Sequence, residues 1–114
     1  MPLPGYPSPP GAKNESLHNV VGPASYTQVS TGSPPTGGQT VSATAFGLQY
    51  ITAAWIVNGS ENGQYYGNVF LNPTQLSGGS ASITLQWITA ATGAEAAGAA
   101  NLSSFHLRIM AVGY

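Results

Sequence analysis

Apolar and polar residues alternate along the second two-thirds of the chain. From residue 39 onward the apolar side chains recur at every second position, which is the period of a strand with one buried face. Runs of this kind cover residues 39–45, 49–57, 64–71, 80–90 and 103–112. Five short strands separated by turn residues predict an all-β fold, a small antiparallel β-sandwich or barrel.

The alternation also predicts which side chains form the core. The positions predicted to face inward are Ile51, Ala53, Trp55 and Val57, then Ile83, Leu85 and Trp87, and finally Phe105, Leu107, Ile109 and Ala111. The positions predicted to face outward are Thr84, Gln86, His106 and Arg108. Both tryptophans are therefore expected in the core, where aromatic side chains bury a large apolar area.

Turn residues predict how two of these strands are connected. The dipeptides Asn58-Gly59 and Asn62-Gly63 favour left-handed hairpin positions, so residues 49–57 and 64–71 are expected to pair as a β-hairpin. The alanine-rich stretch 94–100 has helix propensity but is short and contains Gly98. It is expected to be a loop between the last two strands.

The first third of the chain has a different character. Residues 1–12 contain five prolines, which exclude helix and ladder formation and favour extended polyproline II structure. With a second Pro/Gly cluster at 31–38, this predicts an extended arm over residues 1–37 and a β-domain over residues 38–114. The arm is either a disordered leader or a segment laid over a neighbouring molecule. In the second case its apolar anchors are Tyr6, Leu17, Val20, Val21 and Tyr26.

Charge is scarce. Five of the 114 residues are charged, and the net charge is −1. Nucleic-acid binding needs clustered Lys and Arg, and so does binding to an anionic membrane surface, so neither partner is expected. No apolar run approaches the length of a membrane span, and the first residues lack a signal-peptide pattern. We therefore expect synthesis in the cytoplasm.

The composition favours self-association. A core formed by residues 38–114 is small, and domains of that size usually need disulfides, a metal ion or oligomerisation for stability. The chain has no cysteine and no aspartate, and its two histidines, His18 and His106, lie far apart in sequence. Disulfides are excluded and no metal site is expected, so oligomerisation remains.

Candidate catalytic groups are few. A carboxylate pair would have to come from Glu15, Glu61 and Glu95, and a serine–histidine relay would need His106, which is predicted to face outward. The glycines at 37–38 and 63–67 lack the strand–helix context of a phosphate- or dinucleotide-binding loop. We therefore expect a non-enzymatic protein with no catalytic residues and no cofactor.

Exposed aromatic side chains are the remaining pattern that suits a ligand. Tyr50, Tyr65, Tyr66 and Tyr114 fall near predicted strand ends and can be exposed. Tyrosine displayed near loops can bind carbohydrate or protein.

Several short segments resemble the small virion proteins of tailed bacteriophages. The resemblance covers about residues 40–114 and rests on residues 46–51, 53–55, 91–95, 101–103 and 108–114. It implies a capsid decoration (cement) protein, with the major capsid protein or other virion proteins as partners and the virion as location. Such proteins are often homotrimers whose arms reach over adjacent subunits. A tail tip or fibre component, or an adhesin that binds the host cell surface, is the alternative.

Overall fold

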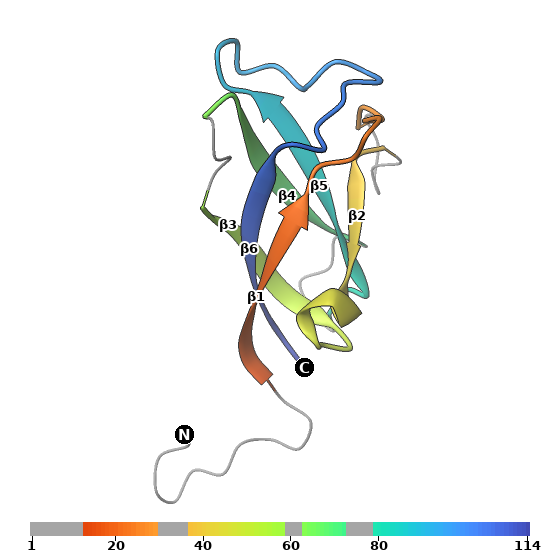
Figure 1. Cartoon of the computed structure of the whole chain (residues 1–114). Helices are drawn as coiled ribbons and strands as arrows, with labels where there is room; N and C mark the ends of the chain where they lie inside the picture. Colours follow the sequence, from red (N-terminus) through yellow and green to blue (C-terminus); the bar gives the residue numbers. More distant parts are fainter. Residues whose placement is uncertain (1–12, 30–36, 59–62, 73–78) are drawn as a thin grey trace, which may run out of the picture.

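The chain folds as two small antiparallel sheets that face each other (Figure 1). The structure is a computed structural model, and it describes residues 13–29, 37–58, 63–72 and 79–114. The all-β class predicted from the alternation is confirmed: the described residues form six strands and one short 3-10 helix.

Each sheet has three strands. Sheet A contains β1 (Lys13–Val21), β6 (His106–Gly113) and β3 (Ile51–Asn58), in the order β1-β6-β3. Sheet B contains β2 (Gln39–Ser42), β5 (Ser82–Thr89) and β4 (Tyr65–Asn72), in the order β2-β5-β4. The two central strands, β6 and β5, are the most buried ones, because each packs against the other sheet and is flanked on both edges.

The core lies between the two sheets. Leu85, Trp87 and Ile109 are fully buried there, and the inward positions predicted for β5 and β6 are confirmed. Thr84 was predicted to face solvent, and that prediction is wrong, since it is 2% exposed. Its hydroxyl accepts a hydrogen bond of 2.6 Å from the Asn72 side-chain amide, and the backbone at Gly38 packs against its methyl group.

The predicted hairpin of residues 49–57 and 64–71 does not form. β3 pairs with β6 and β4 pairs with β5, so the chain crosses from one sheet to the other between these strands. Asn-Gly dipeptides favour a reversal of the chain, but they do not choose the pairing partner of the strands that follow. β3 and β4 instead each complete a sheet around a central strand that is buried between the two sheets. The turn residues 59–62 lie outside the described residues.

β1 is a strand that the sequence did not predict. It pairs antiparallel with β6 in a register that sets Leu17 opposite Met110 and Asn19 opposite Arg108. The alternation is hidden because an inward position of β1 is occupied by the polar residue His18, whose ring packs edge-on against Phe46 at 5.5 Å. The domain therefore begins no later than Lys13, and the predicted boundary at residue 37 is too late.

The segment after β1 is also part of the domain. The Gly22 amide donates to the Phe105 carbonyl (2.9 Å) and the Tyr26 amide donates to the Ala100 carbonyl (3.0 Å). The loop expected at 94–100 is confirmed, because these residues contain no helix and instead pack against segment 22–29. Residues 1–12 and 30–36 lie outside the described part of the chain.

The first predicted strand, 39–45, is shorter than expected. β2 ends at Ser42, and η1 (Ala43–Phe46) follows as a single 3-10 turn. The Ser42 hydroxyl accepts a hydrogen bond from the Thr44 amide, and Gly47, with a φ of 70°, ends the turn. Ala43 and Phe46 are the buried members of the turn and Ala45 is exposed, so the predicted alternation holds only as far as Ala43.

Candidate functional site

One extra residue in β3 reverses which of its side chains face the core. Ile51 pairs with Gly113, but Ala53 already pairs with Val112, so the register shifts at Thr52. Such a β-bulge moves the side chains that follow it to the opposite face of the sheet, up to a second register shift between Ile56 and Asn58. The Thr52 hydroxyl donates to the Val112 carbonyl at 2.9 Å, which helps to hold the bulge.

The core positions predicted after the bulge are therefore wrong. Ile51 is fully buried as predicted, but Trp55 is 44% exposed and Val57 is 48% exposed. Ala54 and Ile56 pack against the core in their place. Residues 55–57 are all apolar, so the sequence is equally compatible with residues 55 and 57 facing the core or with residue 56 facing it. The sequence contained no signal that separates these two arrangements.

Trp55 lies in a row of apolar side chains that crosses sheet A. Met110 on the central strand is opposite Leu17 on one side and opposite Trp55 on the other. The next row toward the C-terminus joins Ala53 and Val112. Beyond it, Tyr114 follows Val112 by alternation, and Tyr50, on the other side of the bulge, lies opposite Tyr114 at the end of the same face. We call this surface the outer face of sheet A; its members are Leu17, Tyr50, Ala53, Trp55, Val57, Met110, Val112 and Tyr114.

Apolar exposure in the described residues is concentrated on this sheet. Seven large hydrophobic side chains are exposed, and six of them belong to the strands of sheet A or directly adjoin them: Leu17, Val21, Tyr50, Trp55, Val57 and Tyr114. The seventh, Tyr66, lies on β4 of sheet B. Single exposed apolar residues are normal on a protein surface, but a continuous apolar face marks an interaction site.

Charge borders this face at one point. Arg108 stands in the row after Met110, and its Nε donates to the Asn19 side-chain oxygen across the strand pair at 3.0 Å. Glu95 and Arg108 are the charged residues whose side chains the structure describes, and Glu95 lies in the loop after β5. The described part of the outer face of sheet A is therefore almost entirely uncharged.

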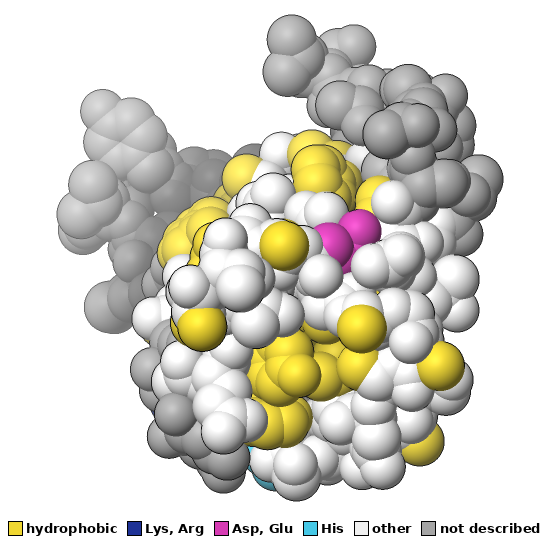
Figure 2. Space-filling model, turned by 90° about the horizontal axis from the view of Figure 1, so that it is seen from above, with side chains coloured by type: hydrophobic (Ala, Val, Ile, Leu, Met, Phe, Trp, Pro, Cys, Tyr) yellow, Lys and Arg dark blue, Asp and Glu magenta, His cyan; other side chains and the backbone are white. Residues whose placement is uncertain are grey.

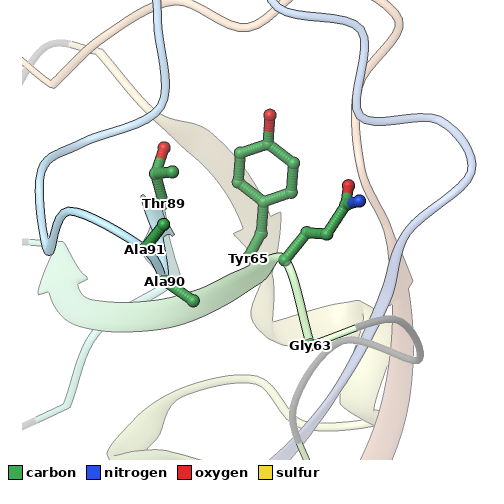
Figure 3. A pocket seen from close by; sticks show the side chains of 6 residues that line it. Gly63, Tyr65, Thr89, Ala90 and Ala91 are labelled. Carbon is green, nitrogen blue, oxygen red and sulfur yellow. The ribbon is translucent and has the colours of Figure 1, made fainter.

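A second surface feature is a hollow of about 550 Å³ at the junction of β4 and the loop after β5. Gly63, Gln64, Tyr65, Thr89, Ala90 and Ala91 line it. Tyr65 and Thr89 are cross-strand partners, and their side chains project in the same direction (Figure 3). The Tyr65 ring is fixed by an edge-on contact with Phe105, with 4.9 Å between the ring centroids.

The lining of this hollow is neutral, with one amide, two hydroxyl groups and apolar surface. Figure 2 shows the molecule from above, with apolar side chains gathered in the middle of the face among polar groups and backbone, and with an acidic side chain beside them. A neutral polar ligand such as a sugar suits these groups better than an ion.

Tyr26 and Glu95 form a hydrogen-bonded side-chain pair inside the domain. The Tyr26 hydroxyl donates to a Glu95 carboxylate oxygen at 2.7 Å and accepts from the Trp87 amide at 3.2 Å. The Val29 amide donates to the same carboxylate oxygen. Burial, together with the hydrogen bond to Glu95, raises the pKa of the Tyr26 hydroxyl well above its usual value. These contacts join segment 22–29 to the loop after β5, which is a structural role.

The structure separates the five predicted arm anchors. Val20 and Tyr26 are 3% and 2% exposed in the core of their own domain, so they cannot anchor the chain to a partner. Leu17 and Val21 are both 48% exposed on β1 and remain candidates for partner contact. Tyr6 lies outside the described residues. Trp55 and Val57 join this set because of the bulge at Thr52, which sequence analysis missed, and Met110 joins it as an outward position of β6.

The described residues contain no group of three or more His, Asp or Glu side chains placed to hold a metal ion. Within the same residues, no helix has the length and apolar character needed to cross a membrane.

Comparison of the chain with protein-family models, with curated proteins and with solved structures found no match.

Proposed function

We propose that this protein is a non-enzymatic structural subunit that works in many copies by burying the outer face of sheet A against neighbouring copies. The observation that carries the proposal is the concentration of six of the seven exposed large hydrophobic side chains on one sheet. Removing such area from water stabilises an interface by about 25 cal/mol per Å². The core of a small domain buries only a limited apolar area, and contact between copies adds to that area.

The assembly that we propose is a virion. The resemblance to small virion proteins of tailed bacteriophages points to a capsid decoration protein that stabilises neighbouring capsid subunits, with the major capsid protein as partner. We take the assembly to be a homotrimer, as the resemblance implies, in which three copies turn the same apolar face toward a common axis. The near absence of charge on this face favours contact with a neutral protein surface over contact with nucleic acid.

Substitution of Trp55 tests the proposal. The chain offers a matched control, because Trp55 on sheet A and Tyr66 on sheet B are both 44% exposed. We expect the wild-type chain to form an oligomer in multi-angle light scattering, and Trp55→Ser to weaken its association at least about tenfold, as for other buried aromatic contacts. Tyr66→Ser should leave the mass unchanged, and circular dichroism should show intact strands in both variants.

Two results would contradict the proposal. One is a wild-type chain that stays monomeric at every accessible concentration. The other is a Trp55→Ser variant that associates as strongly as Tyr66→Ser, since the outer face of sheet A would then not be the contact.

The hollow at Tyr65 favours a second candidate function, a tail tip component or adhesin that binds host-surface glycans. Its uncharged lining offers an aromatic ring beside amide and hydroxyl groups, the combination that neutral sugars require. We expect the wild-type chain to give a signal on a glycan array that Gln64→Ala weakens, because Gln64 is exposed and its loss does not disturb the core. A wild-type chain that binds no glycan would remove this candidate.

A further inference from the structure

Tyr50 and Tyr114 form an exposed aromatic pair at the end of the outer face of sheet A. Their ring centroids are 5.4 Å apart and the ring planes meet at 47°. Tyr50 is 37% exposed and Tyr114 is 43% exposed. The two rings are therefore splayed and partly open to a partner.

The backbone holds this pair in place. The Tyr50 amide donates to the Tyr114 carbonyl at 2.8 Å, and the Tyr114 amide donates to the Tyr50 carbonyl at 3.0 Å. A third bond runs from the Gln49 amide to the same Tyr114 carbonyl at 2.7 Å. A Cβ added to Gly79 would lie 2.8 Å from the Tyr50 Cβ and 3.7 Å from the Tyr114 hydroxyl, so the chain packs closely on one side. Such a pair loses little conformational freedom on binding.

We propose that this tyrosine pair is a docking site for the proline-rich segment 1–12 of a second copy of the chain. The segment contains two overlapping Pro-x-x-Pro sequences, Pro4 to Pro7 and Pro7 to Pro10. Segments of that pattern bind aromatic-lined surfaces in the polyproline II conformation. The inference rests on the proposed function, because it names one of the contacts by which copies would associate.

The chemistry of the two partners is complementary. Prolines have no amide hydrogen, so a proline-rich segment presents carbonyl groups that need donors, and tyrosine hydroxyls supply them. The pyrrolidine rings pack on the faces of the tyrosine rings. Residues 1–12 contain no charged side chain, which suits an uncharged surface.

The position and length of the segment favour a neighbouring copy as the receptor. Lys13 pairs with Gly113, so the chain enters β1 on one side of the end of β6, whereas Tyr50 lies on the other side of that end. To dock on its own tyrosine pair, the segment would have to turn across the end of β6 directly after leaving β1, and the stiffness of a proline-rich segment disfavours that turn. In polyproline II geometry 12 residues span about 37 Å, enough to reach an adjacent small domain.

The first test uses a fluorescent peptide of residues 1–12 titrated into the full-length chain. We expect saturable binding that Tyr50→Ser with Tyr114→Ser weakens at least tenfold. Tyr66→Ser, which removes an equally exposed tyrosine from the other sheet, should leave binding unchanged. Tyr50→Phe with Tyr114→Phe keeps both rings and should retain part of the affinity, which separates loss of docking from loss of folding.

The second test distinguishes a neighbouring copy from the same chain. One full-length variant carries Tyr50→Ser and Tyr114→Ser, and another carries Pro4→Ala, Pro7→Ala and Pro10→Ala, with Ser8→Ala as the control. Docking between copies predicts that mixing the two variants restores association, because one supplies an intact segment and the other an intact tyrosine pair. No gain on mixing, or no peptide binding to the wild type, would overturn the inference.

These outcomes are independent of the Trp55 experiment. If Trp55→Ser dissociates the oligomer while the tyrosine variants bind the peptide normally, the proposed function stands and the docking site falls. If the wild type is monomeric, the proposed function itself falls.

Discussion

At the scale of single residues, Thr52 has the largest effect on the surface of this protein. The bulge at this position turns Trp55 and Val57 outward and brings Ala54 and Ile56 to the core. An exposed tryptophan in an otherwise regular strand is unfavourable in an isolated molecule, because its ring has one of the largest apolar areas of any side chain. Its exposure is understandable if the ring is buried in an assembly.

A second residue-scale contact, between Tyr26 and Glu95, makes stability depend on pH. The pKa of Tyr26 is raised in the folded chain, so the folded state holds this proton more tightly than the unfolded state does. The contribution to stability is complete below the pKa of an unfolded tyrosine, about 10. It is lost as the pH rises above that value, at most by about 1.4 kcal/mol per pH unit for one proton.

We therefore expect the free energy of unfolding, measured with urea, to fall between pH 10 and pH 11 in the wild type. Tyr26→Phe should be less stable at pH 8, because it leaves the Glu95 carboxylate and the Trp87 amide without the hydroxyl, and it should show a smaller decrease above pH 10. Equal pH dependence in both chains would mean that Tyr26 titrates normally in the folded state.

At the scale of elements, β1 and the segment after it close the domain. The Gln39 side chain links the two sheets, because its amide nitrogen donates to the Val21 carbonyl (2.7 Å) and its oxygen accepts from the Trp87 indole (2.9 Å). Gly22 lies against the backbone of Leu102, where it allows segment 22–29 to approach the loop before β6. The edge of the sandwich thus depends on close contact between segments distant in sequence.

Two glycine substitutions test this close approach. A Cβ at Gly22 would lie 2.2 Å from the Leu102 carbonyl oxygen, whereas a Cβ at Gly98 meets nothing within 4 Å. Backbone atoms cannot move aside cheaply, so we expect Gly22→Ala to lower the free energy of unfolding by about 1–3 kcal/mol or more. Gly98→Ala should change it by less than about 0.5 kcal/mol. Similar values for both variants in urea denaturation would show that the two segments are not in contact.

At the scale of the whole molecule, the two sheets differ in what they present to solvent. Sheet A exposes a continuous apolar face, while Tyr66 is the one large apolar side chain exposed among the described residues of sheet B. The chain as a whole carries only five charged residues, so charge has a small part in its contacts. Association through sheet A should depend on apolar burial.

The low charge of sheet A predicts how association between copies depends on ionic strength. At high ionic strength charge–charge contacts are screened, but apolar contacts are not. We expect the mass measured by light scattering to stay constant, or to rise, when sodium chloride is increased from 50 mM to 1 M. Dissociation at high salt would show that ion pairs hold the copies together.

Much of this protein is determined by its sequence alone. The period of two in β5 and β6 predicted their inward residues, because neither strand carries an extra residue that shifts its register. The all-β class and the loop at 94–100 followed from turn residues and from the absence of any long helical period. The low charge is a property of composition and needs no structure.

Only the tertiary structure decided the pairing of strands and the direction in which β3 presents its side chains. β1 escaped prediction because a histidine occupies an inward position, and the histidine is accommodated only by contact with Phe46 from another element. The hairpin expected from Asn-Gly was replaced by pairing with β6 and β5, since strand partners are chosen by long-range burial. The bulge at Thr52 is set by the register of β3 against β6, a relation between segments about 60 residues apart that no local pattern contains.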